Sequence, residues 1–275
     1  MADVQPAREH RERRPDGVEI RWEERGDGPL VVVAHHALWS HPGVYGDLVR
    51  DLARDHRVVV YDPRGYGGST RRGPYDAATD AGDLEAVVAA AGRGAVAVAI
   101  GDGFNRVARV AAARRDLVSF VIALAPAAAA LLPRAELEGS GVMAASESVI
   151  QMLFQMLAAD PRAALRTLIA NINPDLDEER LRERVEEVAA YGGLEPASER
   201  ARAWLEDDVS AETRRLGDRL LILHGGVDPM FEGAMRARVA ELFPAARIEE
   251  IADGAVSRPD ITAAHVRAVT AAARR

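Results

Sequence analysis

The chain has 275 residues, of which 48% are hydrophobic, and its formal net charge is −8 at pH 7. A chain of this length can bury a full core, either as one large domain or as a domain with a smaller insertion. The sequence contains no cysteine, which excludes disulfides, thiolate metal sites and a cysteine nucleophile. Arginine is spread among aspartate and glutamate without forming a basic stripe, so we expect no nucleic-acid partner.

The sequence also lacks the patterns that direct membrane insertion and export. No stretch approaches the run of about 18 apolar residues that crosses a bilayer. The segment 1–14 is polar and charged, without the apolar core of a signal peptide. We therefore expect a cytoplasmic protein with no membrane partner.

Strands and helices alternate along most of the chain. Val18–Glu24 alternates apolar and polar residues like a half-buried strand, whereas Leu30–Ala34 is apolar throughout, like a parallel strand covered on both faces. Such alternation over short loops indicates an α/β fold with a mostly parallel, doubly wound sheet. The other predicted strands are Arg57–Tyr61, Val118–Leu124, Arg219–Leu223 and Arg247–Ile251, the strand–turn–helix segment is Ala95–Ala113, and the other helices are Val44–Ala53, Tyr75–Ala91, Phe231–Leu242 and Arg258–Ala273.

Only helices are predicted between residues 127 and 215. We expect residues 1–126 and 216–275 to form the core domain and 127–215 to form a helical lid (cap) domain over the carboxyl edge of the sheet, where ligands of open α/β sheets bind. Met152, Phe154 and Met156 belong to a wide apolar belt on the helix Ser146–Ala159. They supply either the apolar walls of a pocket or packing between lid and core, and both alternatives stay open.

Four local motifs occur in order along the chain. His35-His36-Ala37 follows the second strand, and Asp62–Ser69 reads DPRGYGGS. The glycine-punctuated turn 101–105 reads GDGFN, and Leu221–Pro229 reads LILHGGVDP. Together they resemble the His-Gly-x, D-x-R-G-x-G-x-S, nucleophile-elbow and acid-bearing segments of the α/β-hydrolases. The resemblance covers nearly the whole chain and implies an α/β-hydrolase fold.

The resemblance also implies a catalytic triad of nucleophile, acid and histidine, and this chain departs from it. Gly103 falls where the elbow carries the nucleophile, and Ala255 falls where the histidine belongs, so that Asp228 alone matches. Serine-hydrolase activity is therefore not expected. The backbone N–H groups that match the oxyanion hole belong to Ala37 and Phe104, and these donors survive the loss of side chains.

Two residues near the turn, His36 and Asp102, each have two alternative roles, and a third residue argues against a dinucleotide-binding motif. His36 replaces a small glycine, and it either projects into the site as an acid or base or fills vacated volume. Asp102 is a nucleophile only if the turn is shifted by one residue, which would place Ile100 and Phe104 at tight positions. Otherwise Asp102 is a solvent-facing residue that helps to cap the next helix. Arg106 stands where a dinucleotide-binding motif would have its third glycine, so that interpretation is poor.

Three functions follow from these observations. The first is a non-hydrolytic enzyme, namely a cyclase, isomerase or lyase of secondary metabolism that acts on an apolar, carbonyl-bearing small molecule through His36, Asp228 or the oxyanion donors. The second is a catalytically inert protein that binds a ligand or a protein in the same cleft. The third is residual hydrolysis through Asp102 or activated water. We expect no cofactor and a small-molecule ligand or substrate, and a homodimer stays open.

Overall fold

The computed structural model describes residues 6–36, 45–126, 131–137, 148, 151–152, 155–156, 158–172, 176–192, 194–225, 233–251 and 258–273. Across these residues an eight-stranded sheet has the order β1-β2-β4-β3-β5-β6-β7-β8. The first two pairings in this order, β1 with β2 and β2 with β4, are antiparallel, and all the others are parallel. The strands are β1 (Arg8–Arg13), β2 (Glu19–Arg25), β3 (Leu30–Ala34), β4 (Arg57–Tyr61), β5 (Ala95–Ile100), β6 (Val118–Leu124), β7 (Leu220–Gly225) and β8 (Arg247–Ile251).

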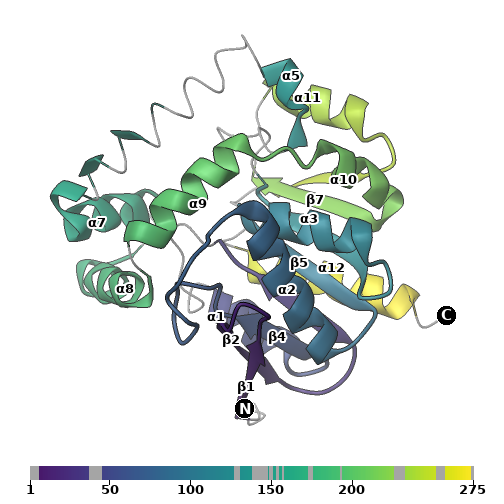
Figure 1. Cartoon of the computed structure of the whole chain (residues 1–275). Helices are drawn as coiled ribbons and strands as arrows, with labels where there is room; N and C mark the ends of the chain where they lie inside the picture. Colours follow the sequence, from purple (N-terminus) through teal and green to yellow (C-terminus); the bar gives the residue numbers. More distant parts are fainter. Residues whose placement is uncertain are drawn as a thin grey trace.

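Both faces of the sheet are covered by helices, as the apolar strands predict. Val31 and Val33 of β3 pack into one hydrophobic cluster, and Val32 and Ala34 pack into another on the opposite face. The first cluster includes residues of α1 (Gly46–Leu52) and α12 (Pro259–Ala272), and the second includes residues of α2 (Ala77–Ala91), α3 (Gly103–Ala113), α10 (Ser210–Leu216) and α11 (Gly233–Leu242). Figure 1 shows α2 and α3 in front of the sheet and α12 behind it. The prediction of a mostly parallel, doubly wound sheet is confirmed.

Sequence analysis did not predict β1. Its six residues are all charged or histidine, and they lie at the edge of the sheet, paired with β2. His10 stacks on Trp22 of β2 with ring centroids 4.1 Å apart. An edge strand made of charged residues has no apolar periodicity to reveal it, and its charges discourage pairing with other chains.

The segment between β6 and β7 is helical in its described parts. It contains α5 (Arg134–Leu137), α7 (Pro161–Ile172), α8 (Glu178–Tyr191) and α9 (Leu194–Glu206), followed by α10 and the short 3₁₀ helix η2 (Gly217–Arg219). α7 and α8 share a small cluster of their own, which includes Leu165, Ile169, Leu181 and Val185. α10 packs on α3 and belongs to the core layer. The division into a core and a lid at residues 127 and 215 stays a prediction.

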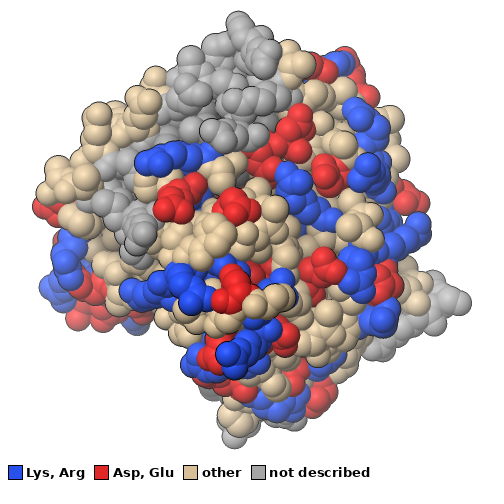
Figure 2. All heavy atoms as spheres, in the orientation of Figure 1, with Lys and Arg blue, Asp and Glu red and all other residues tan. Residues whose placement is uncertain are grey.

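Charged side chains of both signs are mixed over the visible surface. Figure 2 shows no continuous stripe of one sign on this face. Many of these charges form exposed pairs, such as Arg162 with Glu186 across α7 and α8. Among the described residues, none of the helices is both long and apolar enough to span a membrane.

Candidate functional site

The turn between β5 and α3 is the sharpest feature at the carboxyl edge of the sheet. β5 ends at Ile100, and Gly101 then adopts a left-handed φ of +54°, a conformation that side chains disfavour. Sequence analysis placed Gly103 at the centre of this turn, but Gly103 is already the first residue of α3. A Cβ at Gly103 would lie 2.3 Å from the carbonyl oxygen of Ala34. Gly103 is therefore small because α3 approaches β3 closely, and Gly101 makes the turn.

His36 and Asp102 meet beside Gly101. β3 and β5 are parallel neighbours, so the residues that follow their carboxyl ends lie close together. Nδ1 of His36 is 2.7 Å from Oδ1 of Asp102, and the exposed fractions of the two side chains are 25% and 8%. A Cβ at Gly101 would lie 2.7 Å from Cδ2 of His36. The imidazole therefore occupies the space into which a side chain at position 101 would project, held by a buried carboxylate.

The second oxygen of Asp102 faces Arg106 one helical turn further on. Nη1 of Arg106 lies 3.6 Å from Oδ2 of Asp102, and Nη2 of Arg106 donates to the carbonyl oxygen of His35. Burial alone would lower the pKa of Arg106, but the electrostatic effects of Tyr61, Asp102 and Asp80 raise it overall. Asp102 is buried and makes no side-chain hydrogen bond to the first turn of α3. The expectation of a solvent-facing helix cap is therefore wrong.

His35 fixes the chain just before His36. Its Nδ1 lies 3.0 Å from the carbonyl oxygen of His36, and its Nε2 lies 3.1 Å from both the carbonyl oxygen of Tyr61 and the hydroxyl of Tyr191. Burial lowers the pKa of His35 to about 4. A neutral, fully buried His35 thus ties the end of β3 to β4 and α8.

The DPRGYGGS loop, residues 62–69, contacts the groups around His35. Asp62 accepts hydrogen bonds from the Tyr191 hydroxyl at 3.0 Å, from the backbone N–H of Gly68 at 2.9 Å and from Arg21 at 3.2 Å. Arg64 is 2% exposed, and its Nε and Nη2 donate to both oxygens of Asp83 at 2.6 and 2.9 Å. Asp62 and Arg64 of this motif therefore have structural roles, and Asp62 contacts the Tyr191 hydroxyl that lies beside His35.

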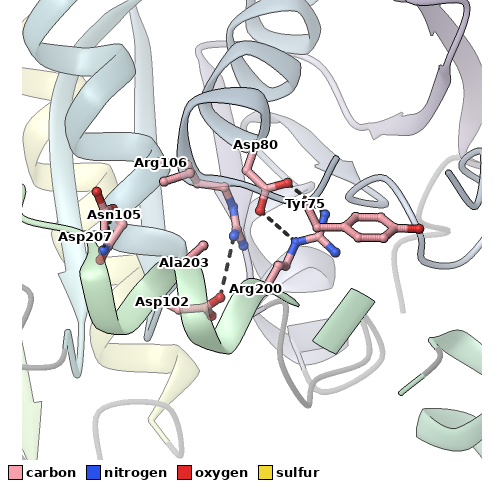
Figure 3. A pocket seen from close by; sticks show the side chains of 9 residues that line it. Tyr75, Asp80, Asp102, Asn105, Arg106, Arg200, Ala203 and Asp207 are labelled. Carbon is pink, nitrogen blue, oxygen red and sulfur yellow. Dashed lines mark hydrogen bonds and ion pairs between the residues drawn. The ribbon is translucent and has the colours of Figure 1, made fainter. Parts of the chain in front are cut away.

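A cavity of about 30 Å³ lies where α9 meets the amino ends of α2 and α3 (Figure 3). Arg200 of α9 reaches across it, and its Nε and Nη2 each lie 2.7 Å from a carboxylate oxygen of Asp80. Sequence analysis had proposed only Asp102 among its lining residues. The other charged residues of the lining were missed because a charged position on a predicted helix is normally assigned to solvent. The lining consists of Tyr75, Ala77, Asp80, Asp102, Asn105, Arg106, Arg200, Ala203 and Asp207.

Several predicted ligand-binding residues lie elsewhere. Phe104 is completely buried in the core, and its backbone N–H donates to the carbonyl oxygen of Gly101 at 3.1 Å. It is therefore occupied within the turn and is not the expected oxyanion donor. Met152 and Met156 are 56% and 38% exposed, so these two side chains lie on the surface. Four further predicted residues lie outside the described residues, namely Ala37, Phe154, Asp228 and Ala255.

Comparison with known proteins agrees with this architecture. The profile of the Alpha/beta hydrolase family matches residues 31–265. Similar solved structures include an esterase from Exiguobacterium antarcticum, with 17% identity over 96% of this chain and 99% of that chain and a TM-score of 0.78. An E-2-(acetamidomethylene)succinate hydrolase has 21% identity over 96% and 98% of the two chains and a TM-score of 0.72. A bromoperoxidase from Bacillus anthracis has 18% identity over 98% and 100% and a TM-score of 0.74.

At these identities the structural likeness shows the fold alone. A search of curated proteins found no significant match. The family profile covers most of the chain, and its span begins within β3 and ends within α12. The chain therefore belongs to the alpha/beta hydrolase family.

Proposed function

We propose that this protein is a hydrolase in which His36, oriented by Asp102, acts as a general base toward water that attacks a carbonyl-bearing small molecule. The observation that carries this proposal is the 2.7 Å contact between Nδ1 of His36 and Oδ1 of Asp102, beside the left-handed Gly101. A base held by a buried carboxylate at the carboxyl edge of a parallel sheet is the arrangement that acyl-transfer chemistry requires.

The carboxylate determines which imidazole nitrogen can take up a proton. Asp102 stabilises a proton on Nδ1 of His36, so the neutral ring carries its lone pair on Nε2. In the proposed reaction Nε2 accepts a proton from water while the water oxygen bonds to the carbonyl carbon. The same proton then passes to the leaving group as its bond to carbon breaks, which yields an acid and an alcohol, thiol or amine.

The elbow residue supports direct attack by water. The family's elbow carries the nucleophile on its strained turn, and we assign that place to Gly101, since Gly103 already belongs to α3. Glycine has no side-chain oxygen with which to form an acyl-enzyme. In the family one oxyanion donor is the backbone N–H of the residue after the nucleophile. The matching donor in this chain is the backbone N–H of Asp102, which precedes α3.

The other hypotheses are less well supported. Asp102 lies at the amino end of α3 with a helical φ of −65°, and its two oxygens face His36 and Arg106, which suits an orienting carboxylate better than a nucleophile. A non-hydrolytic reaction gains no support from membership of the hydrolase family.

The proposal is tested with a panel of small acyl esters, thioesters and amides in ¹⁸O-labelled water. Wild-type protein is expected to release acid that carries one solvent oxygen. His36→Gln is expected to lose about 10²- to 10⁴-fold in kcat/KM. The matched control is His265→Gln on α12, which removes a histidine that pairs with Glu249 at 3.3 Å, away from the site.

Each alternative has a distinct result in the same experiment. Unchanged turnover in His36→Gln would overturn the assigned base. A product without solvent oxygen would favour the cyclase, isomerase or lyase hypothesis. Ligand binding without turnover of any compound would favour the inert binding protein, and a covalent ester on Asp102 would identify that residue as the nucleophile.

A further inference from the structure

Arg106 contacts both chain segments that carry the proposed base and its carboxylate. We infer that Arg106 is a positioning residue, whose guanidinium compensates the charge of Asp102 and so keeps His36 unprotonated and ready to accept a proton near neutral pH. The inference rests on the proposed function, because it explains how the base of that reaction stays available. Figure 3 shows Arg106 reaching from α3 toward Asp102.

The carboxylate of Asp102 is shared between two neighbours. Nδ1 of His36 lies 2.7 Å from its Oδ1, whereas Nη1 of Arg106 lies 3.6 Å from its Oδ2. Nη2 of Arg106 also donates to the carbonyl oxygen of His35, the residue before His36. The guanidinium therefore lies against the carboxylate on the side away from Oδ1 and is tied to the segment from which the imidazole projects.

Burial makes the charge of Arg106 effective. The exposed fractions of the Arg106 and Asp102 side chains are 5% and 8%. Solvent screens such a pair far less than a pair on the surface, so each charge acts strongly on a titratable neighbour. A guanidinium keeps its proton throughout the pH range in which proteins are folded. Arg106 is therefore a constant positive charge beside the carboxylate.

The charge of Arg106 determines how strongly Asp102 attracts a second proton to His36. A buried carboxylate with no other cation nearby favours the imidazolium, which has no lone pair on Nε2 and cannot act as a base. With Arg106 in place the carboxylate is already compensated, and a second cation is disfavoured by the like charge. Asp102 can then orient the neutral ring without converting it to the imidazolium.

The described neighbours of Arg106 and Asp102 do not obscure a titration of His36 near neutral pH. The titratable and charged side chains that face the pair from surrounding elements are His35, Tyr61, Tyr66, Asp80 and Arg200. Burial lowers the pKa of His35 to about 4 and raises the pKa of Tyr61 to about 12. Burial also raises the pKa of Tyr66, and Asp80 pairs with Arg200 at 2.7 Å.

NMR titration of the His36 ring tests this role without a substrate. The Cε1–Hε1 signals of ¹³C-labelled histidines are followed from about pH 5 to pH 9, and the His36→Gln variant identifies the signal of His36. Arg106→Gln keeps a hydrogen-bond donor but removes the charge, and we expect the titration midpoint of His36 to rise by at least about half a pH unit. Arg106→Lys keeps the charge and should raise the midpoint by less than half as much.

A matched control removes the same charge from the same helix. Arg109 lies on α3 and pairs with Asp207 and Glu212. Arg109→Gln should therefore move the midpoint of His36 much less than Arg106→Gln does. Circular dichroism verifies that each variant is folded.

A second pair of variants applies if Arg106→Gln does not fold. The double variant Asp102→Asn with Arg106→Gln leaves neither of the two buried charges unpaired, because it removes both. His36 is then compared between this double variant and Asp102→Asn. The midpoint is again expected to be higher in the protein that lacks the cation.

The inference and the proposed hydrolysis fail in different ways. A midpoint that is unchanged or lower in folded Arg106→Gln protein would overturn the inference, as would an equal rise in Arg106→Lys or in Arg109→Gln. A rise confined to Arg106→Gln, with no acyl compound turned over by wild-type protein, would support the charge effect and contradict the hydrolysis. Where a substrate is turned over, the acid limb of the pH dependence of kcat/KM should move with the midpoint.

Discussion

Nδ1 of His36 and Oδ1 of Asp102 lie 2.7 Å apart, although the two residues follow different strands. They meet because β3 and β5 are parallel neighbours in register, with Ala34 opposite Ala99. Nη2 of Arg106 donates to the backbone carbonyl oxygen of His35, and Nη1 of Arg106 lies 3.6 Å from Oδ2 of Asp102. The sheet order therefore brings His36 and Asp102 together, and Arg106 contacts both Asp102 and the residue before His36.

Asp102→Asn tests whether this contact orients the base. An asparagine side chain of the same shape can donate to Nδ1 and so favours the proton on Nε2, the tautomer that cannot act as the base. We expect a fall of about 10²-fold or more in kcat/KM, measured on whichever substrate of the acyl panel is turned over. If Asp102→Asn keeps the wild-type rate and pH profile, Asp102 does not orient His36.

Gly101→Ala tests the requirement for a residue without a side chain at the turn. The new Cβ would lie 2.7 Å from the His36 ring on backbone with φ +54°. Gly94→Ala is the control, because Gly94 has φ +72° and its Cβ would meet nothing within 4 Å. We expect Gly94→Ala to lower the free energy of unfolding by about 1–2 kcal/mol through backbone strain alone. Gly101→Ala should lose about 1–3 kcal/mol more through the contact, and equal losses in urea unfolding would contradict this account.

Arg64 and Asp83 test the structural role of the DPRGYGGS loop. Both side chains are 2% exposed and form a two-point pair, Asp16 is a second partner of Arg64, and Arg14 is a second partner of Asp83. Asp83→Leu leaves a buried guanidinium without its main partner, and we expect a loss of about 3–5 kcal/mol in unfolding free energy. The double variant Arg64→Met with Asp83→Leu should recover part of that loss, because it removes the buried guanidinium but leaves Arg14 and Asp16 without these partners. If the double variant is no more stable than Asp83→Leu, the Arg64–Asp83 pair stabilises the fold by more than mutual charge compensation.

The stability of the protein should depend on the protonation of His35. Burial lowers its pKa to about 4, whereas an unfolded histidine has a pKa of about 6.5. Between these values the unfolded chain binds a proton that the folded protein excludes, so the free energy of unfolding decreases as pH falls through this window. The loss approaches about 3 kcal/mol below pH 4.

Urea unfolding at about pH 7, 5.5 and 4.5 measures this dependence. His35→Gln should flatten the slope between pH 6.5 and 4, whatever its effect on stability at pH 7. His265→Gln, with its ring on α12, should keep the wild-type slope. A wild-type slope in His35→Gln would assign the pH dependence to other groups.

Much of the fold could be predicted because its signals are local. Leu30–Ala34 and Ala95–Ile100 are continuous apolar runs that only a strand covered on both faces tolerates, and both are buried throughout. The loop Asp62–Ser69 was recognised because its residues DPRGYGGS match the D-x-R-G-x-G-x-S pattern position by position. β1 was missed because its charged residues lie at an edge, where no apolar pattern is needed.

The candidate site was predicted only in part. His36 and Asp102 were both candidates, but the sequence placed the turn at Gly103, since two glycines so close together in the chain look alike until φ is known. The structure assigns the turn to Gly101 because Gly103 lies against the carbonyl of Ala34. Met152 has the hydrophobicity of a pocket wall, yet it lies on the surface, and Phe104, expected to supply an oxyanion N–H, is buried in the core.

Local chemistry was thus sufficient for the buried strands and the family, because each depends on residues close together in the chain. The partners of buried charges were decided by the tertiary structure alone. Arg200 is buried because Asp80 and the carbonyl of Arg64, far away in sequence, meet it across α2 and α9. A charged side chain leaves water only where the fold supplies such compensating partners, and no local pattern encodes which partners those are.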